Sequence, residues 1–441
     1  SLVPRPIGQS MATSADLSPE KRSAQSPEPG SAPTDAPTSP GRAPLDGKGR
    51  RTALLGAMFL MATSAIGPGF ITQTSTFTVQ IGAAFAFAIL VSILIDIAVQ
   101  MNVWRVVGVS GMRAQELANA VLPGLGWVLS VLVFIGGMVF NIGNIAGTGL
   151  GTDAMFGLDP LLGGAASAAI AIAVFLSKRA GMALDRIVLV LGIVMILLMG
   201  FVAVVSNPPV GEAARQTVLP DSVDMLIIVT LVGGTVGGYI TYAGAHRMID
   251  SGVSGVDDVA SITRSSVLSI IVTGVMRVLL FLAILGVVAA GATLNPDNLA
   301  ASAFEHAAGE VGLRMFGVVL WAAAISSVIG AAYTSVSFIT KSTTSARTRN
   351  LLTVAFIAVC AVLYLLLQQA PQTLLVFAGA FNGMILPIGF AALMYVAWRR
   401  RDLLGGYRYP VWLLVIGALA WLVSLVIAVR GFQPMLELFA A

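Results

Sequence analysis

Charged residues are scarce in this chain of 441 residues. Asp, Glu, Lys and Arg make up 10% of it and hydrophobic residues 57%, whereas ordinary soluble domains carry about 25% charged residues. A water-soluble protein of this length needs more charge to cover its surface. Long apolar runs recur, and a transmembrane helix needs about 20 predominantly apolar residues. The composition therefore excludes a soluble protein and indicates a polytopic helical membrane protein.

Cysteine and histidine are almost missing. Cys360 is the single cysteine, which excludes a disulfide within the chain and a cysteine-based metal site. His246 and His306 are the two histidines, and neither belongs to a nucleophile–base pattern. No glycine run has the spacing of a nucleotide-binding loop. We therefore expect no enzyme activity, no cofactor and no nucleic-acid partner.

The N-terminal segment has few large apolar residues. LVPR within residues 1–10 resembles a thrombin site, so we expect this stretch to be an expression-tag remnant and Met11 the native start. Residues 11–51 are rich in Pro, Ser, Ala, Asp and Gly. Such a composition cannot bury enough surface to offset the entropy lost on ordering. It predicts a disordered cytoplasmic tail.

Apolar segments after residue 51 predict eleven transmembrane helices. Lys and Arg gather at alternate ends of these segments. This predicts a multi-pass protein of the plasma (inner) membrane, with its N-terminus in the cytoplasm and its C-terminus outside. Nothing marks a soluble dimer interface, so we expect a monomer in the lipid bilayer. The predicted spans are 52–78, 81–103, 125–152, 160–177, 186–206, 222–250, 262–290, 312–340, 350–368, 372–398 and 410–430.

Two predicted spans are interrupted at corresponding positions. Gly67-Pro68-Gly69 interrupts the first span, and Gly233, Gly234, Gly237 and Gly238 lie within the sixth. Non-helical backbone at membrane depth is tolerated where it lines a cavity or is buried in protein. Matched interruptions are typical of inverted-repeat transporters with a site at the bilayer midplane. We therefore expect a first repeat over 52–206, a second over 222–398, and an additional helix at 410–430.

Four short motifs follow one another along the chain: GPGFI at 67–71, VSGMRAQELA at 109–118, GTGLGTDAMFG at 147–157 and GGTV at 233–236. In this order and spacing they resemble the Nramp (natural resistance-associated macrophage protein) metal-transporter family. The resemblance implies an all-α membrane protein of LeuT-type fold, with five-plus-five inverted repeats and broken helices 1 and 6. It also implies ion-coupled transport by alternating access, with a metal ion as cargo.

The metal-site motifs of that family are missing. Where the family has Asp-Pro-Gly-Asn in the first span, this chain has Thr72–Thr76, and Gly237–Tyr239 replace the Met-Pro-His of the sixth. Asn141 and Asn144 stand where the family has a proton-handling Asp and Glu. The departures predict no metal ligands at the site.

The interrupted spans offer hydroxyls, an amide, tyrosines and free backbone groups, none of them anionic. A transition metal needs anionic or soft ligands, whereas free N–H groups at a helix start suit a carboxylate. We therefore expect a small polar or carboxylate-bearing organic solute of the size of 5-oxoproline, with Mg²⁺ or Mn²⁺ as the alternative cargo. Each hydroxyl can instead bond to its own helix. The expected substrate-binding residues are Thr72, Gln73, Thr74, Ser75, Asn141, Asn144, Gly237, Gly238, Tyr239, Thr241 and Tyr242.

Either H⁺ or Na⁺ is expected as the coupling ion. Ser326 and Ser327 in the eighth span are candidates for a sodium site of LeuT type, with close helix packing as their other role. Asp96 and Arg277 are ionisable residues inside apolar runs, where a charge costs about 2.5–3.5 kcal/mol. Either the two residues pair, or Asp96 lies near Arg105, or Asp96 carries the coupling proton.

Asn382 and Arg247 are the predicted gate residues. Asn382 is a polar residue within the tenth span, close to a proline. Arg247 follows the sixth span, together with Asp250 and, after a short loop, Arg264. We expect these charges to form a solvated network at the inner gate.

Overall fold

The structure of the chain is a computed structural model that describes residues 67–340 and 343–439. All described residues belong to one compact unit, Pro44–Ala441, and the other unit, Ser1–Ala43, lies outside them. The predicted tag remnant (1–10), the predicted tail (11–51) and the first part of the first span (52–66) also lie outside the described residues.

The elements of the described residues are helices. Two short 3₁₀ helices, η1 (Gly82–Ala84) and η2 (Val256–Asp258), precede α3 and α11 respectively. The α-helices are α2 (Pro68–Ile81), α3 (Phe85–Ser110), α4 (Ala114–Val121), α5 (Leu125–Phe156), α6 (Pro160–Leu176), α7 (Lys178–Val205), α8 (Val210–Val218), α9 (Met225–Thr235), α10 (Ile240–Asp250), α11 (Val259–Ala289), α12 (Leu299–Ile339), α13 (Ala346–Leu367), α14 (Pro371–Arg399) and α15 (Val411–Glu437).

The predicted count of eleven spans is not confirmed. Within the described residues, 9 helical segments are long and apolar enough to cross a membrane. The segment Pro68–Ser110 counts as one because α2 and α3 are separated only by the η1 turn. The helix Pro160–Leu176 is apolar but shorter than the others. The predicted spans from 81–103 onward nevertheless each coincide with a helix.

Local sequence signals explain where several helices begin and end. Gly111 and Gly157 follow α3 and α5 with φ of 65° and 67°, a left-handed conformation that glycine adopts without strain. The Asp159 side chain accepts hydrogen bonds from the first amides of α6, where Pro160 takes the first helical position. Asp224 caps α9 in the same way.

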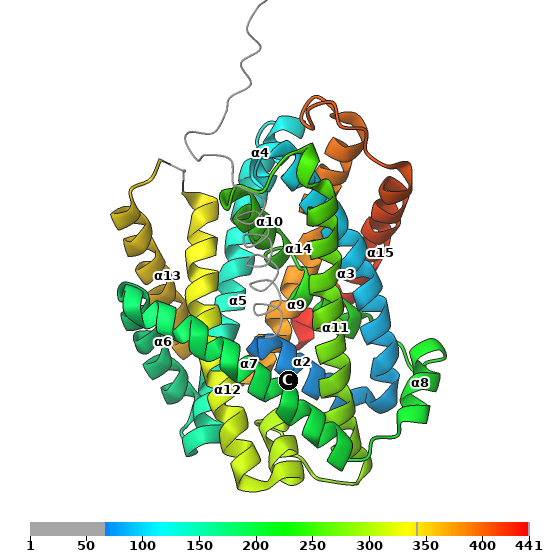
Figure 1. Ribbon diagram of the computed structural model, residues 1–441. Helices are drawn as coiled ribbons and strands as arrows, with labels where there is room; N and C mark the ends of the chain where they lie inside the picture. The colour runs from blue at the N-terminus through cyan, green and yellow to red at the C-terminus, as the bar shows by residue number, and fades with distance from the viewer. Residues whose placement is uncertain (1–66, 341–342, 440–441) are drawn as a thin grey trace, which may run out of the picture. The chain divides into compact units, whose positions relative to one another are not determined.

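The sixth predicted span is broken as expected. α9 ends at Thr235 and α10 begins at Ile240, with a turn between them. α2 begins at Pro68, after an extended Gly67. In Figure 1, the half-helices α2 and α9 lie near the centre of the bundle, where α2 contacts α5, α11, α12 and α14, and α9 contacts α3, α14 and α15. The interrupted ends of the two half-helices are thus enclosed by continuous helices.

Candidate functional site

The turn between α9 and α10 is held by α14. The Gly238 N–H donates to the carbonyl oxygen of Asn382 at 2.7 Å, and the Gly237 N–H donates to the Val232 carbonyl at 2.9 Å. A Cβ atom at Gly238 would overlap the Ile385 side chain, and one at Gly237 would overlap Asn382. Glycine is therefore needed here for close approach to α14, and not for a positive φ.

Gln73, a predicted substrate-binding residue on α2, lies between α9 and α14. Its side chain is 1% exposed and fills space left by Gly234 on α9 and Gly379 on α14. Its Nε2 donates to the Leu375 carbonyl of α14 at 3.2 Å, while its Oε1 has no hydrogen-bond partner. The nearby hydroxyl of Thr230 on α9 also has none. Uncharged polar atoms from α2 and α9 are thus left available at this point.

Two of the predicted hydroxyl donors are already used within α2. Thr74 donates to the Phe70 carbonyl at 2.7 Å, and Ser75 donates to the Ile71 carbonyl at 2.8 Å. This is the alternative in which each hydroxyl bonds to its own helix, and a contact of Thr74 or Ser75 with a substrate stays a prediction. Thr72 and Ser75 line a narrow crevice that Asn298 also borders.

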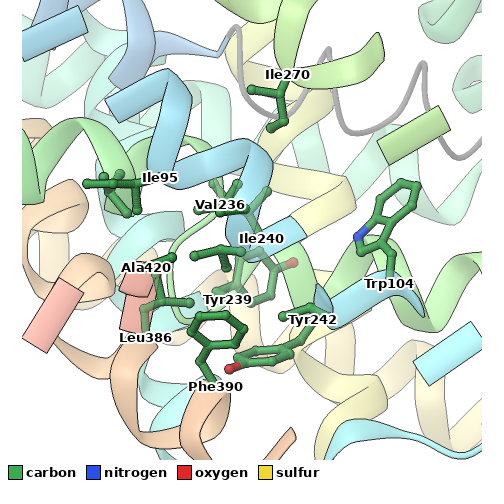
Figure 2. Close-up of a cluster of buried hydrophobic side chains, with 14 of the residues drawn as sticks. Ile95, Trp104, Val236, Tyr239, Ile240, Tyr242, Ile270, Leu386, Phe390 and Ala420 are labelled. Carbon is green, nitrogen blue, oxygen red and sulfur yellow. The ribbon is translucent and has the colours of Figure 1, made fainter. Parts of the chain in front are cut away.

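The residues after the turn separate into two environments. The Tyr239 hydroxyl donates to the Ala331 carbonyl of α12 at 3.1 Å. Tyr242 points into the apolar core beside Phe390 and Leu386, as Figure 2 shows, and its hydroxyl has no partner. Thr241 is fully buried, and its hydroxyl is also unpaired. Tyr239 and Tyr242 both belong to this apolar cluster, and their contact with a substrate stays a prediction.

The asparagines of α5 and α14 have different surroundings. Asn141 is fully buried beside the Cys360 thiol of α13, both of its amide atoms lack a hydrogen-bond partner, and its contact with a substrate stays a prediction. Asn144 is 1% exposed, and its amide nitrogen has no partner. Asn382 donates through Nδ2 to the Gly136 carbonyl at 3.1 Å and to the Ala378 carbonyl, leaving Oδ1 unpaired. Asn382 thereby joins α5 and α14 to the broken helix.

A cavity of about 20 Å³ lies beyond the turn, toward the end of α10, and is large enough for about one water molecule. Arg247 borders it and donates to the Thr334 hydroxyl at 3.1 Å. Ser327, a predicted sodium ligand, lines the same cavity, so a cation bound there would lie near the Arg247 guanidinium. Ser326 precedes it on α12; sodium binding by this pair stays a prediction. The lining residues are Phe140, Tyr239, Ile240, Ala243, Gly244, Arg247, Ser327, Gly330, Ala331 and Thr334.

Arg113 was not predicted as a gate residue, yet it forms the ion pair of the expected inner network. Its Nη2 lies 3.4 Å from Asp250 Oδ1, and its Nη1 donates to the Ser337 carbonyl of α12 at 3.1 Å. The Ala114 N–H donates to His246 Nε2 at 3.2 Å. The arginine at the N-cap of α4 was the sequence signal that could have indicated it.

Asp96 and Arg277 are both buried, at 1% and 2% exposure. Each acts electrostatically on the other, and the Thr235 hydroxyl lies beside both. Arg105 instead donates to Thr263 at 2.5 Å, so the alternative in which Asp96 lies near Arg105 is not supported. The sequence indicated Asp96 and Arg277 as buried charges but did not indicate Thr235, whose hydroxyl lies beside both at the end of α9.

These features describe a polytopic helical membrane protein in which a turn separates α9 from α10. The sequence model of the family Nramp, natural resistance-associated macrophage protein-like, matches residues 58–433. The chain belongs to the Nramp family.

Relatives and solved structures agree with this assignment. The chain is 50% identical over 388 residues to an uncharacterized membrane protein, YcsG, of Bacillus subtilis, covering 88% of this chain and 95% of that protein. The fold is similar to a mutant manganese transporter of Eremococcus coleocola, with a TM-score of 0.69, 16% identity and 90% of each chain covered. It is also similar to MhsT in complex with L-phenylalanine, with a TM-score of 0.60, 17% identity, and 90% of this chain and 100% of that one covered.

Proposed function

We propose that this Nramp-family chain moves its cargo by alternating access through a site around Gln73, between α2, the α9–α10 turn and α14. The supporting observation is the set of buried polar atoms without partners at that point: Gln73 Oε1, Thr230 Oγ1 and Asn382 Oδ1. A buried polar group left unpaired costs about 1–3 kcal/mol. A polar cargo that pairs with these atoms removes that cost.

A divalent metal ion, Mg²⁺ or Mn²⁺, is the cargo that the comparisons favour over an organic solute. The family model covers most of the chain, and the manganese transporter of Eremococcus coleocola has a similar fold. A hydrated Mg²⁺ can be held partly through its own waters. The amide oxygens of Gln73 and Asn382 and the hydroxyl of Thr230 would have to supply the remaining contacts.

A small carboxylate-bearing solute is the cargo that the site geometry favours. Within residues 67–340 and 343–439, no cluster of three or more His, Cys, Asp or Glu side chains can hold a metal ion. The sequence between Arg51 and Asp96, which includes the whole first span, contains no acidic residue, histidine or cysteine. The N-terminus of α2 carries a partial positive charge, which attracts an anion and repels a metal ion. On these grounds a carboxylate is the cargo we put first.

One experiment separates the two cargoes. The purified full-length protein is heated with small carboxylates, with MnCl₂ or with MgCl₂, and the same solutes are offered to proteoliposomes. Stabilisation and uptake of a carboxylate, with no effect of either metal, supports the organic cargo. Metal uptake that is lost on substitution of Gln73, without any response to carboxylates, overturns it. Imposed gradients of H⁺ or Na⁺ then test which ion is coupled.

A further inference from the structure

The buried guanidinium of Arg277 lies where α2 begins and α9 ends. Arg277 on α11 places its Cζ 4.7 Å from the centroid of the Phe70 ring, in the first turn of α2. Its Nη1 donates to the hydroxyl of Thr235, the last residue of α9, at 3.2 Å. One side chain from a continuous helix therefore contacts the interrupted ends of both α2 and α9.

Arg277 has donors that the described residues do not use. Its Nε and Nη2 have no hydrogen-bond partner, although the side chain is 2% exposed. A guanidinium is a planar fork of N–H donors that matches the two oxygens of a carboxylate. Because an unpaired donor on a buried charge is costly, an anion that accepts from both nitrogens would bind with a gain in free energy.

Asp96 on α3 is the resident countercharge. Neither of its carboxylate oxygens accepts a hydrogen bond, so the pair attract each other through space without joining directly. Arg277 is the charged group that acts on Asp96, and Thr235 is the polar group beside it. On its own helix, Ser92 donates to the Ile89 carbonyl and Gln100 donates to Ser269 of α11. The charges of Asp96 and Arg277 therefore offset each other, while Nε and Nη2 of Arg277 have no acceptor among the described residues.

We propose that Arg277 binds the carboxylate of the cargo where α2 begins and α9 ends, and that Asp96 is the acid whose protonation offsets the charge of that carboxylate. A proton from water binds a carboxylate oxygen of Asp96 and removes its charge. The cargo carboxylate then accepts hydrogen bonds from Nε and Nη2 of Arg277. One proton and one carboxylate enter together, so the site gains no net charge.

This arrangement links binding to movement. Thr235 ends α9 and already accepts a hydrogen bond from Arg277, so a carboxylate that draws the guanidinium toward itself changes the contact at the helix end. The inference rests on the carboxylate cargo of the proposed function, and it adds the residue that recognises the charge and the reason for proton coupling.

The test uses the full-length protein with lactate, pyruvate and 5-oxoproline as probes, each beside its carboxamide. An amide has nearly the shape of the acid but no charge. For the wild type we expect carboxylates to stabilise the protein at concentrations about tenfold lower than the amides, the value of one or two charge-assisted hydrogen bonds. The preference should strengthen at acidic pH. Uptake into proteoliposomes should not respond to a potassium–valinomycin potential.

Variants assign the preference to the residues. Arg277→Gln alone would leave Asp96 buried without its countercharge and is expected to be unstable. The D96N/R277Q double variant removes both charges, and we expect it to fold and to bind acid and amide equally. D96N alone leaves Arg277 buried without its countercharge, so it should gain more stability from a bound carboxylate than the wild type does, without dependence on pH. Arg277→Lys keeps the charge without the fork, and its preference should lie between those of the wild type and the double variant.

Each failure has its own readout. A double variant that still prefers carboxylates overturns the role of Arg277. If the double variant does not fold, Arg277→Lys takes its place, and a preference equal to that of the wild type overturns the role of Arg277. Carboxylate uptake that follows the membrane potential overturns the role of Asp96 while leaving the proposed function intact. If no carboxylate stabilises or enters the wild-type protein, the carboxylate cargo itself is wrong and this inference falls with it.

Discussion

The amide of Gly238 donates to the carbonyl oxygen of Asn382 at 2.7 Å, which fastens the interruption between α9 and α10 to the middle of α14. A backbone group at membrane depth needs such a partner, since no water is present in the bilayer core to replace it. The broken helix is thus stabilised from outside itself, and a movement of α14 would act directly on the site.

Replacing Gly238 with alanine should slow transport. The new Cβ would overlap the Ile385 side chain, and overpacking of this kind costs about 1–3 kcal/mol. We expect a folded protein with a lowered apparent melting temperature and at least about tenfold slower uptake, as that free energy implies. Gly192→Ala on α7, where a Cβ meets open space, is the matched control. Equal uptake by both variants would show that the close contact is not needed.

Replacing Gln73 with glutamate should exchange the preferred cargo. The side chain keeps its size, and its buried position between Gly234 and Gly379 then holds a negative charge. We expect loss of stabilisation by carboxylates, because like charges repel in a low dielectric. A thermal shift with MnCl₂ should appear in its place. Gln368→Glu places the same change on an exposed residue and should leave both responses as in the wild type.

Loss of the Arg113–Asp250 ion pair should open the path toward the cavity beside Arg247. Arg113 also holds the Ser337 carbonyl of α12, so Arg113→Gln removes two contacts between α4, α10 and α12. With Cys360→Ala as background, a Ser327→Cys reporter on the cavity wall should react with a maleimide up to about fivefold faster, the range of an exposed pair. Arg215→Gln, which breaks the exposed pairs of Arg215 with Glu212 and Asp221, should not change that rate.

Acid should weaken the α8 segment that precedes α9. Hydrogen bonds from Arg215 and Gln216 lower the pKa of Glu212 from 4.5 to about 2. A carboxyl whose folded pKa is depressed stabilises the fold above its ordinary pKa, and this stability is lost as the pH falls from 4.5 toward 2. The apparent melting temperature should therefore decline over that range, and decline less in Glu212→Gln. Glu305→Gln, an exposed control, should follow the wild-type curve; an unchanged slope in Glu212→Gln would contradict the assignment.

Long apolar runs in the sequence predicted the long helices, because hydrophobic burial along a helix depends on residues close together in the chain. The short helices α4 and α8 were not predicted, and the count of eleven spans is not confirmed. The paired interruptions and the motif resemblance also predicted the Nramp family and its LeuT-type fold, which the family match and the solved structures support.

The hydrogen-bond and packing partners of individual side chains were harder to predict from the sequence. Thr74 and Ser75 are polar residues at the expected place, yet their protons bond within α2. Asn141 faces Cys360, and Tyr242 enters the core. Each outcome depends on how a helix is rotated about its axis and which neighbour it meets, and a pattern of three or four residues leaves that rotation uncertain by a full helix face.

Composition, breaks and motifs are properties of the chain, so they were enough to identify a helical membrane protein of the Nramp family with interrupted central helices and no acidic metal motif. That Arg277, Asp96 and Thr235 meet at the end of α9, and that Asn382 holds the turn, could be seen only in the folded protein. These residues lie on α3, α9, α11 and α14, far apart in sequence, and packing alone brings their side chains together.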